Sequence, residues 1–156
     1  MPRLSPALLA FAVLTLAVLA TGGVGVADDY IGAEQCKSCH PAEYAQWKAT
    51  PHARASAALG PDERRDARCT GCHATAAEAG LWGVQCESCH GPGRHYWPDF
   101  IMRDAHLARA AGLQSGAEPS ICRGCHTADA PRIVPFDTET ALDRVRHAVP
   151  ASPGAP

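Results

Sequence analysis

The fold of this chain is decided by a five-residue motif that occurs four times: Cys36-Lys37-Ser38-Cys39-His40, Cys69-Thr70-Gly71-Cys72-His73, Cys86-Glu87-Ser88-Cys89-His90 and Cys122-Arg123-Gly124-Cys125-His126. These motifs contain all 8 cysteines of the 156 residues. Cys-x-x-Cys-His is the attachment signature of c-type haem. Its two thiols form thioethers with one edge of the macrocycle, and the adjacent histidine becomes the proximal iron ligand. The sequence therefore predicts four covalently bound haem c groups with their iron.

Three other uses of paired cysteines fit this pattern less well. Cys-x-x-Cys pairs also bind structural zinc, but zinc does not require a histidine directly after each second cysteine. Disulfides are common in secreted proteins, yet a bridge within Cys-x-x-Cys closes a very small loop and stabilises little. A thioredoxin-like dithiol is expected once, within a βαβ unit. Covalent haem is therefore the interpretation that we adopt.

The chain is poor in the side chains that form a hydrophobic core. From Asp28 onward, fifteen of 129 residues are Leu, Ile, Val or Phe, below the level of about 20% at which chains begin to resemble disordered ones. Four macrocycles would supply large apolar faces in place of these side chains. We therefore expect a small single domain at residues 28–149, mostly α-helical with long loops and few or no strands, wrapped around four haems.

The first 27 residues have the pattern of a secretory signal peptide. Arg3 precedes an apolar run from Ala7 to Ala20, and small residues follow as far as Ala27. We expect cleavage before Asp28 and a periplasmic protein, with membrane contact only if the segment stays uncleaved. The uncleaved anchor is the alternative, because the apolar stretch extended to Val26 would nearly span a bilayer.

The charge of the chain is close to balanced, with 16 acidic and 14 basic residues and a formal net charge of -2. No run of lysine and arginine occurs in the sequence. Nucleic acid is therefore not an expected partner.

Secondary structure is expected to be sparse. Proline at the first helical position predicts a helix over Pro41–Ala49, and Asp137 or Thr138 can cap another over Thr138–Ala148. Two more are expected over His52–Leu59 and Arg103–Ala111. Gly91-Pro92-Gly93 predicts a turn, and residues 150–156 predict a disordered tail.

Four histidines lie outside the motifs: His52, His95, His106 and His147. Each haem iron offers a sixth coordination position, and imidazole is a good donor for iron. His52 lies twelve residues after His40, across a mostly helical segment that carries the chain roughly 15 Å away on the proximal side. We therefore expect His52 to ligate a haem other than the one at His40.

The other three histidines differ in how they could reach a haem iron. His95 follows His90 by five residues, a span of at most ~17 Å, which is too short to pass comfortably around the ring, so His95 should also serve a neighbouring haem. His147 lies on the last predicted helix and can close over a haem from a distance. His106 lies on a partly polar helix and has two interpretations, as an iron ligand or as a contact for solvent or a propionate.

Several residues around the motifs resemble the tetrahaem cytochrome c-554 family. The first block is Tyr30-Ile31-Gly32, the first motif, Glu43, Trp47 and His52-Ala53; the second is the string from Gly83-Val84-Gln85 through the third motif to Gly91-Pro92-Gly93-Arg94-His95. The resemblance runs from about Tyr30 to His147. It implies a mostly helical fold around closely packed haems in parallel-stacked and near-perpendicular pairs.

The resemblance also implies a ligand set. By position, His52 would be the distal ligand of the haem at His90, His95 that of the haem at His126, and His147 that of the haem at His40. The haem at His73 would lack a sixth ligand unless His106 fills the place. The expected iron ligands are therefore His40, His73, His90, His126, His52, His95 and His147.

Two functions follow from these expectations. The first is an electron carrier, not an enzyme, that exchanges electrons with redox-partner proteins in the periplasm, alone or as a subunit of a larger complex. The second is a small multihaem oxidoreductase acting on a nitrogen or sulfur oxyanion at an open haem. The chain is small and has no Cys-x-x-Cys-Lys motif to mark a special catalytic haem. These points, and the resemblance, favour the carrier. Trp47, Trp82 and Trp97 are expected to pack against porphyrin edges.

Overall fold

A computed structural model describes residues 26–116, 118–127 and 136–148 of the chain. The signal peptide predicted for residues 1–27 lies almost wholly outside these ranges, as does the tail predicted for residues 150–156. The elements in chain order are η1 (Val26–Asp29), α2 (Ala33–Lys37), α3 (Pro41–Lys48), η2 (His52–Ala58), η3 (Glu63–Arg65), α4 (Ala67–His73), β1 (Ala74–Ala76), η4 (Ala77–Ala79), β2 (Leu81–Trp82), α5 (Cys86–His90), α6 (Asp99–Met102), α7 (Ala105–Ala110), α8 (Pro119–Arg123) and α9 (Thr138–Val145). The expectation of a mostly helical chain is confirmed.

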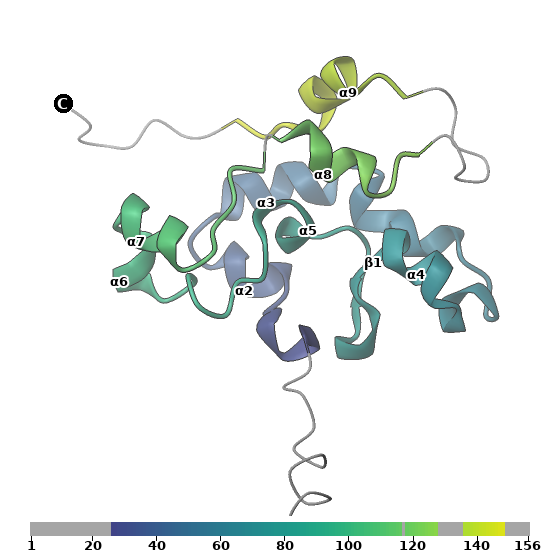
Figure 1. Ribbon diagram of the computed structural model, residues 1–156, viewed down its shortest axis with the longest axis horizontal. Helices are drawn as coiled ribbons and strands as arrows, with labels where there is room; N and C mark the ends of the chain where they lie inside the picture. Colours follow the sequence, from purple (N-terminus) through teal and green to yellow (C-terminus); the bar gives the residue numbers. More distant parts are fainter. Residues whose placement is uncertain (1–25, 117, 128–135, 149–156) are drawn as a thin grey trace, which may run out of the picture.

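The second and third motifs lie on the short helices α4 and α5, and the first and fourth motifs begin in the last turns of α2 and α8. In Figure 1, α3 and α5 occupy the middle of the molecule, α4 and β1 lie at one end, and α6 and α7 lie at the other. Helices α8 and α9 lie together along one side.

Local sequence explains where several helices begin. Asp66 caps α4 by accepting from the backbone N–H of Arg68, and Asp137 caps α9 by accepting from those of Glu139 and Thr140. A side-chain oxygen at this position satisfies an N–H that has no partner within the helix. Pro41 and Pro119 lie in the first turns of α3 and α8, where the missing N–H costs nothing.

Two predicted helices are close to the observed ones. The helix predicted over Pro41–Ala49 is α3, and the one predicted over Thr138–Ala148 is α9, which ends at Val145. The segment predicted over His52–Leu59 forms a 3-10 helix, η2, rather than an α-helix.

The helix predicted to begin at Arg103 begins later. The Asp104 side chain accepts from the N–H groups of His106 and Leu107, so α7 begins at Ala105. Arg103 instead ends the separate helix α6, and its guanidinium pairs with Asp99 in that helix.

The strands form one small antiparallel pair. Ala74 of β1 is opposite Trp82 of β2, and Ala76 is opposite Leu81, with an irregularity between the two pairs. Gly80, with φ of 72°, reverses the chain between them, a conformation that glycine adopts readily. This hairpin joins the second motif to the third.

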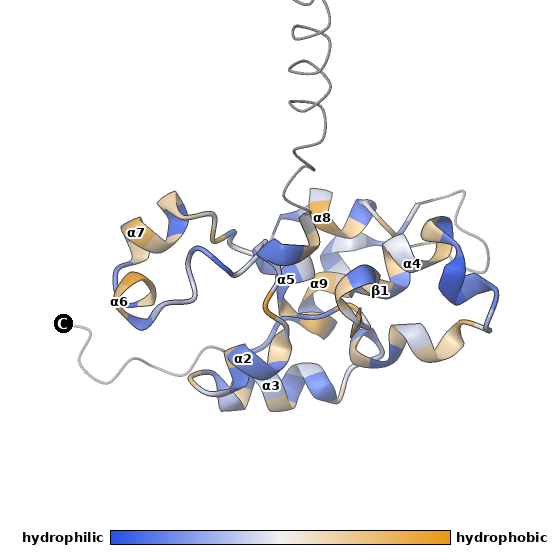
Figure 2. Cartoon of the chain, turned by 90° about the horizontal axis from the view of Figure 1, so that it is seen from below, coloured by the Kyte–Doolittle hydropathy of each residue, from blue (hydrophilic) through white to orange (hydrophobic). Residues whose placement is uncertain are grey.

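Side chains of the described residues provide almost no core. The buried apolar residues are Ala33, Ala74, Ala76, Tyr96 and Ala108, and four of these five are alanine. Meanwhile Trp97, Phe100 and Leu107 are about half exposed or more, and Figure 2 shows hydrophobic residues on α6 and α7. Apolar side chains of the polypeptide are therefore exposed, and bound haem groups would cover this apolar surface.

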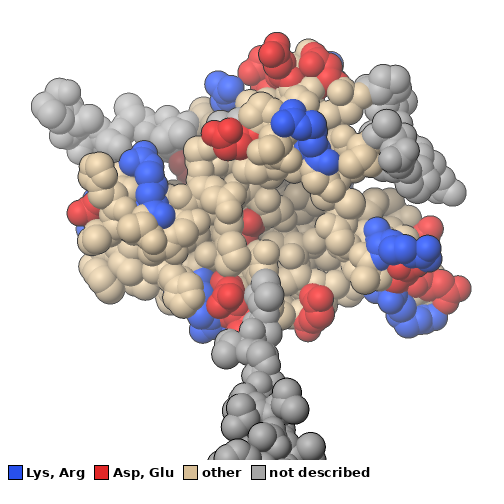
Figure 3. Space-filling view, viewed as in Figure 1, with Lys and Arg blue, Asp and Glu red and all other residues tan. Residues whose placement is uncertain are grey.

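The outer surface carries mixed charges. On the face shown in Figure 3, acidic and basic side chains stand mainly around the edge. The side chains of Arg65 and Asp62 form a strongly exposed pair, and such pairs add little stability. None of the helices within the described ranges is long and apolar enough to cross a membrane.

Candidate haem-binding site

The motif helices present their cysteines for attachment to one edge of a planar group. Helix α5 spans the whole third motif, and α4 spans the whole second motif. Residues three positions apart share one face of a helix. The two thiols of each of these motifs therefore point the same way, and the histidine follows at the helix end.

Cysteines of different motifs meet in pairs. The thiol of Cys36 contacts that of Cys86, and this contact together with burial raises the pKa of Cys36. The thiols of Cys72 and Cys125 also make contact, and burial followed by this contact raises the pKa of Cys125 to about 12. The first motif is therefore adjacent to the third, and the second is adjacent to the fourth.

A further proximity between cysteines brings these two pairs of motifs close to each other. Burial raises the pKa of Cys89, and the nearby Cys122 thiol raises it further. The third motif therefore lies close to the fourth. In space, the motifs follow the order first, third, fourth, second, which differs from their order in the sequence.

Two spare histidines face motif histidines. The ring centres of His52 and His126 are 6.1 Å apart, at an interplanar angle of 54°. The ring centres of His90 and His147 are 6.0 Å apart, at 39°. A metal–imidazole bond is about 2 Å long, so two imidazoles on opposite sides of one iron have ring centres about 6 Å apart. Both observed separations match this value.

The nitrogen atoms of these rings support the same interpretation. Nδ1 of His126 and Nδ1 of His147 are buried and have no hydrogen-bond partner among the described residues. Buried polar atoms without partners are rare in folded proteins. Phe136 stacks on the His126 ring at 3.9 Å, which fixes the ring orientation. These rings therefore fit a site completed by a bound group.

Backbone carbonyl groups orient the rings of two motif histidines, His73 and His90. Nδ1 of His73 is 2.7 Å from the carbonyl oxygen of Ala55, and Nδ1 of His90 is 3.1 Å from that of Gln114. An Nδ1–H group that donates to a carbonyl leaves Nε2 unprotonated and available to a metal. This is the second-sphere arrangement expected for a proximal iron ligand.

Burial favours the neutral form of the first ring pair. Burial lowers the pKa of His52, and the neighbouring His126 lowers it further. Burial also lowers the pKa of His126. Neutral imidazole is the form that coordinates metals, so both rings are prepared for ligation.

This pairing differs from the one that the family resemblance implies. The resemblance assigns His52 to the haem at His90, and His147 to the haem at His40. In the structure, His52 lies beside His126, and His147 lies beside His90. His52 and His147 therefore each lie beside a motif histidine other than the one that the resemblance implies.

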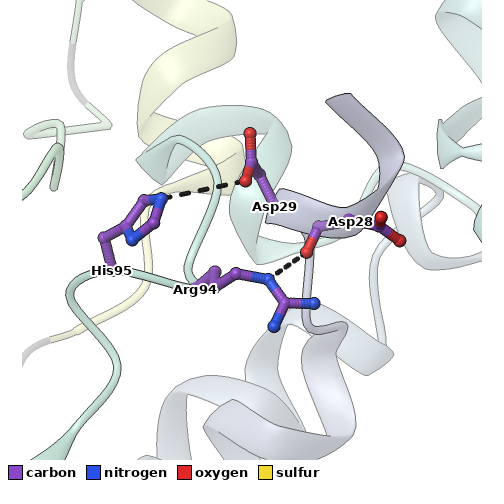
Figure 4. Close-up of a pocket in the computed structure, with 4 residues that line it drawn as sticks. All are labelled: Asp28, Asp29, Arg94 and His95. Carbon is purple, nitrogen blue, oxygen red and sulfur yellow. Dashed lines mark hydrogen bonds and ion pairs between the residues drawn. The ribbon is translucent and has the colours of Figure 1, made fainter. Parts of the chain in front are cut away.

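His95 and His106 lie at the surface. Nε2 of His95 is 3.8 Å from a carboxylate oxygen of Asp29. Arg94 beside it donates to the carbonyl oxygen of Asp28, and the four residues line a shallow cavity of about 520 Å³ (Figure 4). His106 is exposed on the first turn of α7. The resemblance assigns His95 to the haem at His126, but in the structure it is His52 that lies beside His126.

Two of the three tryptophans have defined polar or charged contacts. Trp47 donates from Nε1 to the carbonyl oxygen of Val84 at 2.8 Å, which ties α3 to the segment before the third motif. The guanidinium of Arg64 lies 5.4 Å above the Trp82 ring. Trp97 is 49% exposed. The predicted packing against porphyrin edges stays a prediction for all three.

Sequence reasoning missed one residue of this region. Glu87, between the cysteines of the third motif, is only 2% exposed. Its carboxylate accepts from the backbone N–H groups of Ile31, Gly32 and Gly93. An acidic residue inside a motif, followed by Gly93 six residues later, was the available signal. Glu87 holds the segment before the first motif against the third.

A mostly helical chain with Cys-x-x-Cys-His helices, nearly no side-chain core and facing imidazole pairs has the features of a c-type cytochrome. Comparison with known sequences agrees. The family described as "Cytochrome c554 and c-prime" matches residues 35–91, which include the first three motifs. The chain is 34% identical over 121 residues to cytochrome c-554 of Nitrosomonas europaea, a match that covers 59% of this chain. The predicted resemblance to the cytochrome c-554 family is confirmed.

The match has limits. The chain spans about half the length of that relative, since 50% of it is covered. No solved structure matches the chain.

Proposed function

We propose that this chain is a periplasmic tetrahaem c-type cytochrome that transfers electrons between redox-partner proteins through mainly bis-histidine haems. The observation that carries the proposal is the spacing of the two imidazole pairs, 6.1 Å for His52 and His126 and 6.0 Å for His90 and His147. Two axial imidazoles saturate an iron, which suits electron transfer and leaves no position for a substrate.

The residues have separate tasks in this proposal. The cysteines Cys36, Cys39, Cys69, Cys72, Cys86, Cys89, Cys122 and Cys125 hold the haems covalently. His40, His73, His90 and His126 are the proximal ligands. Bound haem iron would supply one-electron chemistry by changing between ferric and ferrous forms.

His52 and His147 are the distal ligands opposite His126 and His90. His95 is then the distal candidate for the haem at His40. The backbone N–H of Arg94 donates to the carbonyl oxygen of Asp29 at 3.0 Å, which keeps this segment beside the chain that leads into the first motif.

The contacts between motifs support a defined route for electrons. The Cys36–Cys86 and Cys72–Cys125 contacts, with Cys89 near Cys122, put the attachment points in one continuous series. The route would run between the first and second motifs by way of the third and fourth. Partners would therefore exchange electrons near the two ends of this series, at α2 and at α4.

A second candidate function is reduction or oxidation of a nitrogen or sulfur oxyanion at an open haem. The observation that favours it concerns His73. In the described ranges, imidazole pairs at about 6 Å involve His90 and His126 but neither His73 nor His40, and the resemblance leaves the haem at His73 without a sixth ligand. The carrier remains the better-supported function, because an enzyme would also need acid or base groups beside the open iron.

Mass spectrometry and EPR spectroscopy test the proposal. The protein is produced in a strain that matures c-type cytochromes. Its mass should exceed that of the polypeptide by four haems, and EPR of the oxidised protein should show mainly low-spin iron. A bare polypeptide or a zinc-bound form would overturn the haem assignment. Four haems that are all high-spin would overturn the bis-histidine assignment and favour the enzyme.

A further inference from the structure

The carboxylate of Glu87 occupies a cradle made by the backbone. Oε1 accepts from Ile31 N at 2.9 Å and from Gly93 N at 2.7 Å, and Oε2 accepts from Gly32 N at 2.7 Å. Two of the three donors belong to consecutive residues, and consecutive backbone N–H groups form anion-binding concavities. All three partners are backbone N–H donors, and carboxylate oxygens accept hydrogen bonds from such donors.

Glycines make this cradle possible. Gly32 has φ of 84°, a conformation that other residues adopt with strain. A Cβ built on Gly93 would lie 2.9 Å from Oε1 of Glu87. The backbone of Gly93 can therefore approach the carboxylate only because it lacks a side chain. The surrounding chain is built to hold a negative charge in the interior.

The carboxylate of Glu87 lies where the first and third motifs meet. Glu87 lies within the third motif, and its carboxylate is bonded to Ile31 and Gly32, which directly precede α2 and the first motif. The thiols of the two motifs meet here, where Cys36 contacts Cys86. A buried charge acts strongly on neighbours because water does not screen it. Glu87 is therefore closest to the two redox groups predicted at His40 and His90.

We propose that Glu87 is a positioning and electrostatic residue that lowers the reduction potentials of the haems at His40 and His90 below those of the other two. A fixed negative charge stabilises the ferric form relative to the ferrous form, because reduction adds one more negative charge nearby. Electrons would then run downhill from the first and third haems toward the fourth and second. The inference rests on the proposed function, since it needs haems at these motifs.

A set of three variants tests the inference. Glu87→Gln removes the charge with little change in shape, and Glu87→Asp keeps the charge on a shorter side chain. Glu34→Gln is the matched control. It removes the same charge two residues before Cys36, but the Glu34 side chain is 69% exposed, so solvent screens its effect.

Redox titration followed by EPR resolves the individual haems. Glu87→Gln should raise the ferrous-to-ferric ratio of the haems at His40 and His90 at least tenfold at a fixed applied potential, equivalent to 59 mV for one electron. The other two haems should shift less. Glu87→Asp and Glu34→Gln should stay near the parent. Equal shifts in Glu87→Gln and Glu87→Asp would mean that shape rather than charge matters and would overturn the proposal.

The parent protein supplies a test that does not depend on any variant folding. Its two lowest potentials should belong to the haems at His40 and His90, at low and at high ionic strength alike, because the charge is buried. Lowest potentials at the haems of His73 and His126 would contradict the inference. A mass that shows four haems confirms the proposed function separately, so a failure of one conclusion is distinguishable from a failure of the other.

Discussion

The imidazole of His90 lies against the backbone of Gly116, so closely that a Cβ on Gly116 would stand 2.7 Å from Cε1 and 3.1 Å from Nε2 of the ring. The same loop holds the histidine at two other points. Gln114 donates its N–H to the carbonyl oxygen of His90 at 2.9 Å and accepts from the ring Nδ1 through its own carbonyl oxygen at 3.1 Å. The loop at residues 112–116 therefore sets the orientation of this proposed proximal ligand.

Gly116→Ala should displace the His90 ring and perturb one haem of the four. Real Cβ atoms do not approach other atoms at 2.7 Å, so either the loop or the ring must move. We expect altered EPR g-values, or conversion to high spin, for the haem at His90 alone. Gly80→Ala is the control, because Gly80 has φ of 72°, close to the 73° of Gly116, but nothing within 4 Å of its Cβ position.

A second variant separates the clash from backbone strain. Asn tolerates a left-handed backbone better than Ala does, so Gly116→Asn relieves the strain but keeps the Cβ. The haem signal should be perturbed in Gly116→Asn as it is in Gly116→Ala. An unperturbed signal in both Gly116 variants would refute the role of this glycine.

His52→Ala should open the iron at His126. The two rings are 6.1 Å apart, and removal of His52 leaves one axial ligand. One additional haem of the four should become high-spin, and added imidazole should restore the low-spin signal. The affected haem is identified by NMR of its ring methyl groups. A change at the haem of His90 instead would contradict this pairing and support the one that the family resemblance implies.

Asp66→Ala should destabilise the second motif in a pH-dependent way. The hydrogen bond to the Arg68 side chain, followed by that to the Arg68 backbone, lowers the pKa of Asp66 to about 2 from an ordinary value of 3.8. The stabilisation is therefore fully present above about pH 4 and is lost as the pH falls toward 2. The parent should have the higher melting temperature between pH 5 and 7, and the difference should narrow below pH 4.

A neighbouring aspartate serves as the control for this variant. Asp62 forms an exposed ion pair with Arg65, but its side chain makes no cap hydrogen bond at the start of η3. Asp62→Ala should change the melting temperature little at any of these pH values. A difference between parent and Asp66→Ala that is the same at pH 7 and pH 2 would rule out the ionised cap.

The sequence predicted the parts of this molecule that depend on short-range chemistry. The helix at Pro41 follows from proline at its first turn. That His52 serves a haem other than that of His40 stays a prediction, made from chain length alone. The split between α6 and α7 was missed, because Asp104 was not considered as a cap between two helical segments. Cap geometry depends on which of several polar residues the chain uses.

The sequence alone could not predict which histidine rings lie beside one another. Whether His52 faces His90 or His126 depends on the order of the motifs in space, which the contacts between Cys36 and Cys86 and between Cys72 and Cys125 establish. These contacts join residues about fifty apart in the chain. The hydrogen bonds of Glu87 could not be predicted for the same reason, since its partners Ile31 and Gly32 lie 56 and 55 residues away.

The coordination of the iron predicted at His73 distinguishes a carrier whose irons are all six-coordinate from a protein with one reactive iron. The ring of His73 is held from one side by the carbonyl oxygen of Ala55. His106, the candidate for the opposite side, is exposed on α7, and α7 lies at the other end of the molecule from α4 (Figure 1). We therefore expect a five-coordinate iron at His73.

His106→Ala tests this expectation directly. The oxidised parent should show one high-spin haem by EPR, and the signal should be unchanged by His106→Ala because His106 is too far away to ligate that iron. Nitric oxide added to the reduced parent should bind to one haem of the four. A parent without a high-spin signal, which gains one when His106 is removed, would show instead that α7 moves to supply the missing ligand and that all four irons are saturated.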